Sequence, residues 1–303
     1  MKLESLLPAS RRLLRVTDDV FIDRGAIALL APRLKKRFIL PAHKDFSKQP
    51  LLFYLLVDGL NFCFWHPEPK QRFTFRGFTG SVGFGYALLY AMERRPRLFA
   101  PRALREKPTR AFSALLEGTR GILLLREERI RIMKEIGSFA ERIDIESALH
   151  AFEARDVNSI ARFLLQSLPY TFADITKTRG VELLFFKKLR LLISDLAELA
   201  GFRFKRLDTL LIYADYKIPQ LFLNAGVMQV SAALTRRIRD QRLIAHNALP
   251  EIILRAGSVV AAAHLKTKLA ISYPELDFRL WRASKLPEYM QPFPHHRTMS
   301  RFY

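Results

Sequence analysis

Cysteine is almost missing from this sequence, because Cys63 is the only one among 303 residues. A single thiol cannot close an intrachain disulfide or supply the paired cysteines of a zinc site. Histidines at metal-ligand spacing with a third ligand nearby are missing as well, so we expect no metal. Scarce cysteine is typical of a reducing compartment, and we predict a cytoplasmic protein.

Long hydrophobic runs are also missing. The most apolar stretch, residues 51–65, contains Asp58 and Asn61 and is shorter than the roughly 20 residues of a membrane-spanning helix. No apolar segment follows Met1–Glu4, so the start of the chain does not look like a signal peptide. We predict a buried helix in residues 51–65 and no membrane partner.

Acidic residues are few relative to basic ones. The chain has 29 aspartates and glutamates against 50 lysines and arginines, which gives a net charge of +21. Such an excess attracts anions, whether nucleic acid, an acidic membrane or a phosphorylated small molecule. The charge does not choose among them, and a solvated basic face is the simplest interpretation of any one run of arginines.

Strand patterns are scarce, and helical periodicity dominates the sequence. Several candidate helices open with a proline, which suits a first helical turn. The sequence therefore predicts a mainly α protein with one small β-hairpin near residues 70–80 and a surface loop at residues 96–108. The predicted helices cover residues 123–136, 156–168, 180–200, 219–238, 250–268 and 274–286.

No linker rich in glycine, proline or serine interrupts the chain, and no internal repeat is visible. We therefore predict one compact helical domain over residues 41–303. Residues 1–40 are expected to form an N-terminal extension packed on that domain.

Asp215 stands among aromatic residues just before a predicted helix. One interpretation is structural, namely a helix cap or a salt bridge to Lys217. The other is a carboxylate that accepts hydrogen bonds from the N–H groups of a ring stacked on Tyr213. The sequence leaves both interpretations open.

Asp277 is a second carboxylate in aromatic surroundings. On a helix it shares a face with Trp281, four residues later, and with Tyr273, four residues earlier. Glu275 and Arg279 share a different face and can pair in solvent. The alternative for Asp277 is a helix-start carboxylate that is stabilised by the helix dipole.

Weaker candidates are spread along the chain. Asn61 and Trp65 are one turn apart if their segment is helical, and a structural asparagine is the simpler interpretation. The glycines of residues 77–85 lack the spacing of a dinucleotide fingerprint and indicate close helix packing. The run His295–Arg297 suits either a phosphate contact or a solvated tail, and His43 suits a surface turn.

Two buried aspartates among aromatic rings are suited to cleaving a bond between a base and a sugar. Glycoside cleavage passes through an oxocarbenium-like transition state, which a nearby carboxylate stabilises. Bases in turn need stacking surfaces and polar groups that contact their edges.

The sequence resembles the queuosine salvage proteins, which are queuosine 5′-phosphate N-glycosylases/hydrolases. The similar segments keep the same order from about residue 40 to the C-terminus, which makes the resemblance specific. They are Leu60–Trp65, Arg126–Arg129, Gly180–Leu196, Tyr213–Gln220, Leu276–Trp281 and Pro294–Arg297.

The resemblance implies a fold related to helix-hairpin-helix DNA glycosylases and no cofactor. It implies hydrolysis of queuosine 5′-phosphate to queuine and ribose 5-phosphate, a salvage step for tRNA modification. Asp277 matches the catalytic carboxylate of the family. Asp215 matches the aspartate that recognises the base, and Tyr213 matches an aromatic that stacks on the base. His43 and Tyr273 match further ligand contacts.

The implied substrate fits the residues chemically. A 7-deazapurine has carbon in place of N7, so the usual site for protonating the leaving base is missing and stabilisation of the sugar cation by Asp277 matters more. The 5′-phosphate gives part of the positive charge a use, and we expect Lys187, His296 and Arg297 to contact it.

Two other classes of function compete with this one. A nucleic-acid-binding protein, or a glycosylase acting on polymeric RNA or DNA, fits the positive charge and the aromatic run at residues 72–78. An inactive protein that keeps only the fold is the third possibility, and the presence of both Asp215 and Asp277 argues against it.

Overall fold

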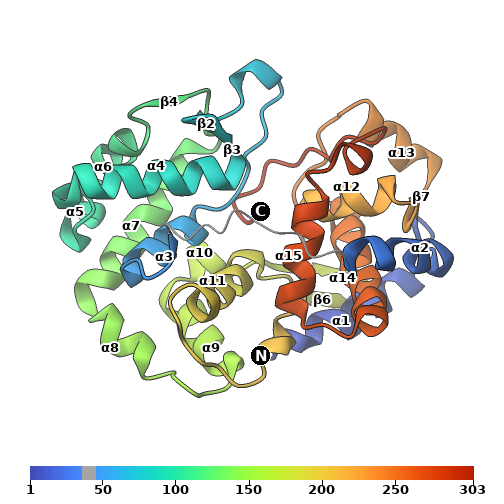
Figure 1. Ribbon diagram of the computed structural model, residues 1–303, viewed down its shortest axis with the longest axis horizontal. Helices are drawn as coiled ribbons and strands as arrows, with labels where there is room; N and C mark the ends of the chain where they lie inside the picture. The colour runs from blue at the N-terminus through green and yellow to red at the C-terminus, as the bar shows by residue number, and fades with distance from the viewer. Residues whose placement is uncertain (36–45) are drawn as a thin grey trace. The chain divides into compact units, whose positions relative to one another are not determined.

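The computed structural model describes residues 1–35 and 46–303, and it is mainly α, as predicted (Figure 1). His43 lies outside the described residues. The chain divides into two compact units, each formed by separate stretches of sequence. The relation to helix-hairpin-helix glycosylases stays a prediction. Among the described helices, none combines the length and apolarity needed to cross a bilayer.

Unit 1 comprises Met1–Ala42, Asp174–Arg190 and Arg206–Met299. Its α-helices are α1 (Leu6–Arg15), α2 (Arg24–Lys35), α12 (Lys217–Asn224), α13 (Ala232–Arg239), α14 (Leu249–Leu269) and α15 (Tyr273–Ala283). Its strands are β1 (Val20–Ile22), β5 (Ile175–Thr178), β6 (Val181–Leu184) and β7 (Met228–Val230). Short 3₁₀ helices, η1 (Leu3–Ser5), η5 (Leu207–Leu210) and η6 (Pro287–Tyr289), complete it.

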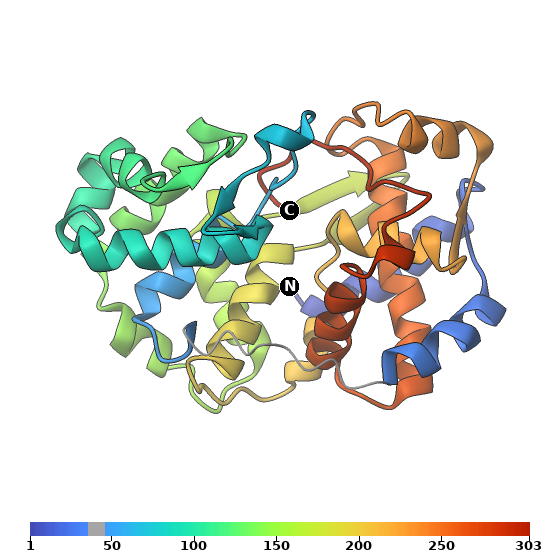
Figure 2. The same cartoon turned by 45° about the horizontal axis from the view of Figure 1, so that its top comes forward.

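Helix α14 forms the centre of unit 1. It was predicted over residues 250–268, and it is buried nearly all round, as expected for a helix whose apolar residues encircle it. Pro250 stands in its first turn, and the helix ends where Ala270 adopts a left-handed conformation. Helices α1, α2 and α12 pack against it, and Figures 1 and 2 both show α1 beside α14.

The N-terminal residues belong to the core of unit 1. Strand β1 pairs antiparallel with β7, with Val20 opposite Val230. Leu6, Leu13 and Ile27 are buried in the same apolar cluster as α14.

Two helix predictions in unit 1 were wrong in part. The predicted helix 219–238 is broken into α12, β7 and α13, because Gly226 turns with a φ of +70° and β7 finds its hydrogen-bond partner in β1. The predicted helix 180–200 begins only at Lys187. Before it, β5 and β6 form a hairpin whose turn, Arg179–Gly180, has positive φ at both residues.

Unit 2 comprises His43–Ala173, Leu191–Lys205 and Ser300–Tyr303. Its α-helices are α3 (Leu51–Gly59), α4 (Gly80–Arg94), α5 (Pro101–Glu106), α6 (Pro108–Leu115), α7 (Arg126–Arg142), α8 (Ile145–His150), α9 (Val157–Ser167) and α10 (Pro169–Phe172). Helix α11 (Lys187–Glu198) starts in unit 1 and continues into unit 2. Strands β2 (Thr74–Phe75), β3 (Phe78–Thr79) and β4 (Thr119–Arg120) and the 3₁₀ helices η3 (Pro69–Gln71) and η4 (Pro96–Leu98) complete it.

The predicted hairpin near residues 70–80 is confirmed as β2–β3, and β4 adds a third strand. The hairpin lies against the start of α4. A Cβ added to Gly83 would come within 2.4 Å of the Phe78 carbonyl oxygen, so the expected close packing of this glycine-rich stretch is confirmed. The helices predicted at 123–136 and 156–168 correspond to α7 and α9, and Asp156 caps α9.

Two other expectations in unit 2 were wrong. Residues 96–108 form η4 and α5 rather than a loop, because each short helix there opens with a proline. Residues 60–65 are not helical, so Asn61 and Trp65 do not share a helical face. The buried Arg129 guanidinium satisfies this backbone instead, donating to the carbonyls of Leu60 at 2.7 Å and Phe62 at 2.5 Å.

Candidate functional site in unit 1

The backbone of Tyr213 is hydrogen-bonded to the carboxylate of Asp277. Asp277 lies on α15, whose first turn is capped by the Ser272 hydroxyl, and its side chain is buried to 8% exposure. Its Oδ1 accepts the Tyr213 N–H at 2.7 Å. Two positions that are 64 residues apart in the sequence are thereby brought together, with the carboxylate held in one orientation.

Tyr213 belongs to an irregular segment between η5 and α12. Leu211 enters it with a φ of +56°, and the Tyr213 side chain is only 6% exposed. The Ala214 carbonyl accepts a hydrogen bond from the Nε of Arg255 on α14 at 3.1 Å. Consecutive residues of this segment are thus fixed to two different helices, α15 and α14.

Asp215 caps α12. Its Oδ1 accepts the N–H groups of Lys217 at 2.7 Å and Ile218 at 3.2 Å, so the capping interpretation is confirmed. The alternative of a salt bridge to Lys217 is wrong, because the described residues show no ion pair between the two side chains, and the Lys217 ammonium donates to Gln220 at 2.9 Å. The Asp215 side chain is half-buried, and within the described residues its Oδ2 accepts no hydrogen bond. Capping therefore leaves one oxygen of this carboxylate available to a ligand.

Tyr273 is the first residue of α15 and stands one turn before Asp277. Its N–H donates to Asp208 at 2.7 Å, and Asp208 also pairs with Lys266 at 2.7 Å. The Lys266 ammonium lies 5.2 Å from the centre of the Tyr273 ring. Burial raises the pKa of the Tyr273 hydroxyl, so it is a neutral hydrogen-bonding group at physiological pH.

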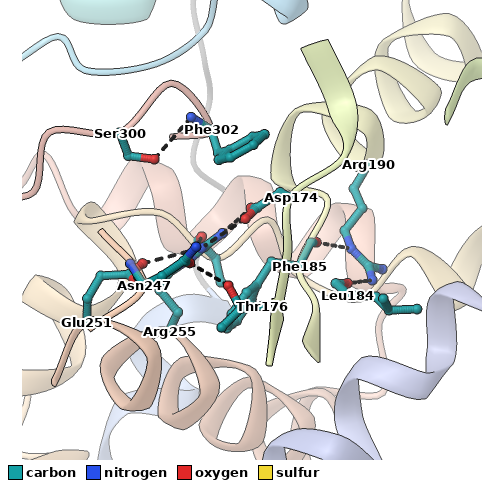
Figure 3. Close-up of polar contacts among 11 residues, drawn as sticks. Asp174, Thr176, Leu184, Phe185, Arg190, Asn247, Glu251, Arg255, Ser300 and Phe302 are labelled. Carbon is teal, nitrogen blue, oxygen red and sulfur yellow. Dashed lines mark hydrogen bonds and ion pairs between the residues drawn. The ribbon is translucent and has the colours of Figure 1, made fainter. Parts of the chain in front are cut away.

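A buried ionic network centred on Arg255 supports this region through the hydrogen bond to Ala214, and Figure 3 shows Arg255 with Asp174 and Glu251. Arg255 has no exposed surface, and its guanidinium pairs with Asp174 at 2.5 Å and with Glu251 at 3.3 Å. The guanidinium carbon also lies 3.8 Å from the centre of the Phe185 ring. Glu251 accepts the N–H of Asn247 at 3.1 Å through its other oxygen. These contacts restrain the Arg255 side chain, whose Nε donates the hydrogen bond to Ala214.

Arg190 organises the start of α11 in a similar way. Its guanidinium donates to the carbonyls of Phe185 at 2.7 Å and Leu184 at 3.0 Å (Figure 3). It also donates to the carbonyl of Leu3 at 2.9 Å. Burial lowers the pKa of Arg190 to about 9, which still leaves it a cation at neutral pH. These bonds hold the turn that leads from β6 into Lys187.

The three residues expected to contact phosphate differ in character. Lys187 is buried to 6% exposure at the first position of α11. Arg297 is half-buried, and its guanidinium donates to Gln241. His296 is 2% exposed, and burial, together with the nearby His295 and Arg255, lowers the pKa of His296 to about 3. His296 is therefore neutral at physiological pH and cannot contribute positive charge.

The sequence did not reveal the buried ionic residues that support the segment around Tyr213. Arg255, Glu251 and Asp174 did not stand out as candidates, although a charged pair four residues apart inside the apolar run of α14 is unusual. Asp174 could not be found from the sequence, because it is 81 residues from its partner. Within the part of the chain that the structure describes, no three metal-ligating side chains lie together.

The structure thus presents a buried carboxylate on α15, an aromatic segment tied to it and a second, capping carboxylate nearby in the sequence. The family model of queuosine salvage proteins matches residues 41–303, and the chain belongs to this family.

Curated relatives carry one name, queuosine 5′-phosphate N-glycosylase/hydrolase. The protein from Sphaerobacter thermophilus is 29% identical over 321 aligned positions, which cover 98% of this chain and 97% of the relative. The protein from Nematostella vectensis is 27% identical, with 86% and 84% covered. That from Schizosaccharomyces pombe is 24% identical, with 89% and 88% covered.

Proposed function

We propose that the chain is an N-glycoside hydrolase that cleaves queuosine 5′-phosphate. Water adds across the bond between base and sugar, the base leaves as queuine with a proton, and the hydroxyl remains on ribose 5-phosphate. The observation that carries the proposal is the hydrogen bond from the Tyr213 N–H to Asp277, which brings together a carboxylate and the aromatic segment suited to a base. Family membership and the names of the relatives support the same reaction.

Asp277 acts on the sugar in this proposal. As the bond to the base lengthens, positive charge develops on the ribose, and an ionised carboxylate stabilises it or forms a bond to it. The Tyr213 N–H holds Asp277 in place before the substrate binds, so no reorganisation is needed during the reaction. A 7-deazapurine offers no N7 to protonate, so this electrostatic contribution carries much of the rate.

The base is held by the segment next to Asp277. The Tyr213 ring stacks on the deazaguanine, and the Oδ2 of Asp215 accepts a hydrogen bond from an N–H on the edge of the base. Tyr273 and His43 are proposed as further ligand contacts. For the 5′-phosphate we propose Lys187 and Arg297 as cations and His296 as a neutral hydrogen-bond donor.

The test follows the release of queuine from queuosine 5′-phosphate by mass spectrometry. Wild type is compared with Asp277→Asn, which keeps the size of the side chain and removes its charge. We expect the variant to lose at least about a hundredfold in rate, equivalent to about 2.7 kcal/mol of barrier. Glu275→Gln is the matched control, because Glu275 lies on the same helix and pairs with Arg279 at an exposed position.

Each result of this experiment has one meaning. Full activity in Glu275→Gln with loss in Asp277→Asn supports both the reaction and the role of Asp277. Activity that survives in Asp277→Asn rejects that role and moves attention to Asp215. A folded wild type that releases no queuine, without added metal or coenzyme, overturns the proposed substrate.

A further inference from the structure

Unit 2 contains a pocket of about 690 Å³, and none of the residues of the candidate site in unit 1 lines it. One wall is a single stripe of α4, formed by Tyr86, Leu89, Tyr90 and Glu93 at helical spacing. The opposite wall is the β2–β3 hairpin, which Gly83 allows to lie close against α4. The pocket is therefore built by packed elements with its aromatic residues already in place.

The rings of the pocket form a stacking surface. Phe78 of the hairpin is 46% exposed, and its ring lies 4.8 Å from that of Tyr86 with 33° between the planes. Phe75 and Tyr90 form a second pair at 5.6 Å. Exposed aromatic rings that gather at a pocket with a polar rim are typical of a ligand-binding groove.

Positive charge surrounds these rings. The guanidinium of Arg76, in the hairpin turn, lies 4.6 Å from the centre of the Tyr90 ring, and that of Arg94 lies 5.3 Å from it. Neither arginine forms an ion pair with any described residue, and both are exposed. Among the described residues that line the pocket, Glu93 is the one with a carboxylate. Flat rings, guanidinium groups outside any ion pair and a carboxylate that accepts hydrogen bonds are complementary to a base that carries a phosphate.

We propose that this pocket binds a nucleotide. The base stacks on Phe78 and Tyr86, the phosphate contacts Arg76 and Arg94, and the Glu93 carboxylate accepts a hydrogen bond from an exocyclic amino group. The nucleotide is either a free monophosphate or an unpaired nucleotide of an RNA strand, since both offer the same chemistry. This site does not depend on the hydrolase activity proposed above.

The test measures binding by fluorescence anisotropy, with a labelled single-stranded RNA 12-mer, alone and in competition with AMP. We expect Phe78→Ala to weaken binding about tenfold, because stacking on an aromatic residue contributes about 1–3 kcal/mol per base. Arg76→Gln should weaken binding and lower the slope of log Kd against log salt by about 0.7, the value for one lost phosphate contact on a single strand.

Matched controls come from the rest of the chain. Arg179 occupies the same place in the β5–β6 turn as Arg76 does in the β2–β3 turn, before a glycine and at positive φ. Because Arg179 does not line the pocket, Arg179→Gln should bind the probes as wild type does. Phe21 is another exposed phenylalanine, on β1, and Phe21→Ala serves in the same way. Thermal melting verifies that every variant is folded, and queuine release should be unchanged in the two pocket variants.

The outcomes separate the two sources of nucleotide. Competition by AMP, lost in Phe78→Ala, supports the pocket with a free monophosphate as ligand. Binding of the 12-mer that AMP does not displace, but that Phe78→Ala weakens, supports an RNA strand. Equal binding by wild type and both pocket variants, or no binding of either probe, overturns the proposal. Neither result changes the interpretation of the Asp277 experiment.

Discussion

The buried histidine near the C-terminus shows how the charge of a single residue depends on the fold. His296 was expected to contact phosphate on the basis of its place in the run His295–Arg297. The structure buries it, and the lowered pKa follows from that burial. The sequence shows that position 296 carries an imidazole ring. The protonation state of that ring depends on packing that only the folded unit supplies.

The low pKa of His296 predicts how stability depends on pH. The unfolded chain binds a proton on this histidine near pH 6.5, whereas the folded chain does so only near pH 3. The unfolded state therefore binds more protons between these values, and the free energy of unfolding falls as pH decreases from 6.5. The slope from this residue is about 1.4 kcal/mol per pH unit.

Chemical denaturation of His296→Gln at pH 6.5, 5.5 and 4.5 checks this prediction. The variant should lose stability with decreasing pH less steeply than wild type, by about 1.4 kcal/mol per pH unit. His150→Gln, at an exposed position, is the control and should keep the wild-type slope. Parallel curves for wild type and His296→Gln would show that this histidine stays charged in the fold.

At the scale of secondary structure, the sequence predicted elements whose signals are local. Helix α14 has a proline in its first turn and an apolar run along its length, and α9 follows a capping aspartate. The sequence did not predict the elements that depend on pairing with residues far away in the chain. Residues 228–230 form a strand only because residues 20–22 pair with them, and residues 181–184 have apolar spacing that suits a helix as well as a strand.

The same distinction applies to the site. The sequence predicted Asp277, Tyr213 and Asp215 as separate features of two segments, each with a structural alternative. Their connection through one hydrogen bond, and the support from Arg255, depend on how α14 and α15 pack. No periodicity in the chain carries that information.

Arg255 joins α14 to the start of β5 and to the segment before α12. Its replacement by methionine leaves Asp174 and Glu251 buried without their cation, so we expect a loss of about 3–5 kcal/mol in the free energy of unfolding. Arg255→Lys keeps a charge but lacks the fork that reaches Asp174, Glu251 and Ala214 together, so it should restore only part of the stability.

Urea denaturation measures this prediction, with Arg102→Met as the matched control. Arg102 and Glu106 are also a pair four residues apart on a helix, but they are exposed, so the control should lose less than about 1 kcal/mol. A loss of similar size in both methionine variants would mean that the Arg255 network contributes no more than a surface pair.

At the scale of the whole molecule, the net charge of +21 exceeds what one substrate phosphate requires. A compact site and an extended basic surface respond differently to salt. Binding of one nucleotide involves a single phosphate, whereas a bound strand releases counterions from many phosphates and weakens steeply as salt rises. Ionic strength therefore distinguishes the proposed catalytic site from any use of the surface charge.

We predict that queuosine 5′-phosphate stabilises the protein and that duplex nucleic acid does not. The measurement is thermal melting of Asp277→Asn, which should bind the nucleotide without consuming it. Stabilisation follows RT ln(1 + [L]/Kd), or about 2.7 kcal/mol at a hundredfold excess over Kd, because the ligand binds only the folded state. Unphosphorylated queuosine is the control for the phosphate contact and should stabilise less.

The shift in melting temperature caused by the nucleotide should change little between 0.1 and 0.5 M salt, since one phosphate contributes a small salt slope. A duplex that raises the melting temperature as much as the nucleotide at 0.1 M salt, and loses this effect at 0.5 M, would instead make polymeric nucleic acid the ligand that the positive charge serves.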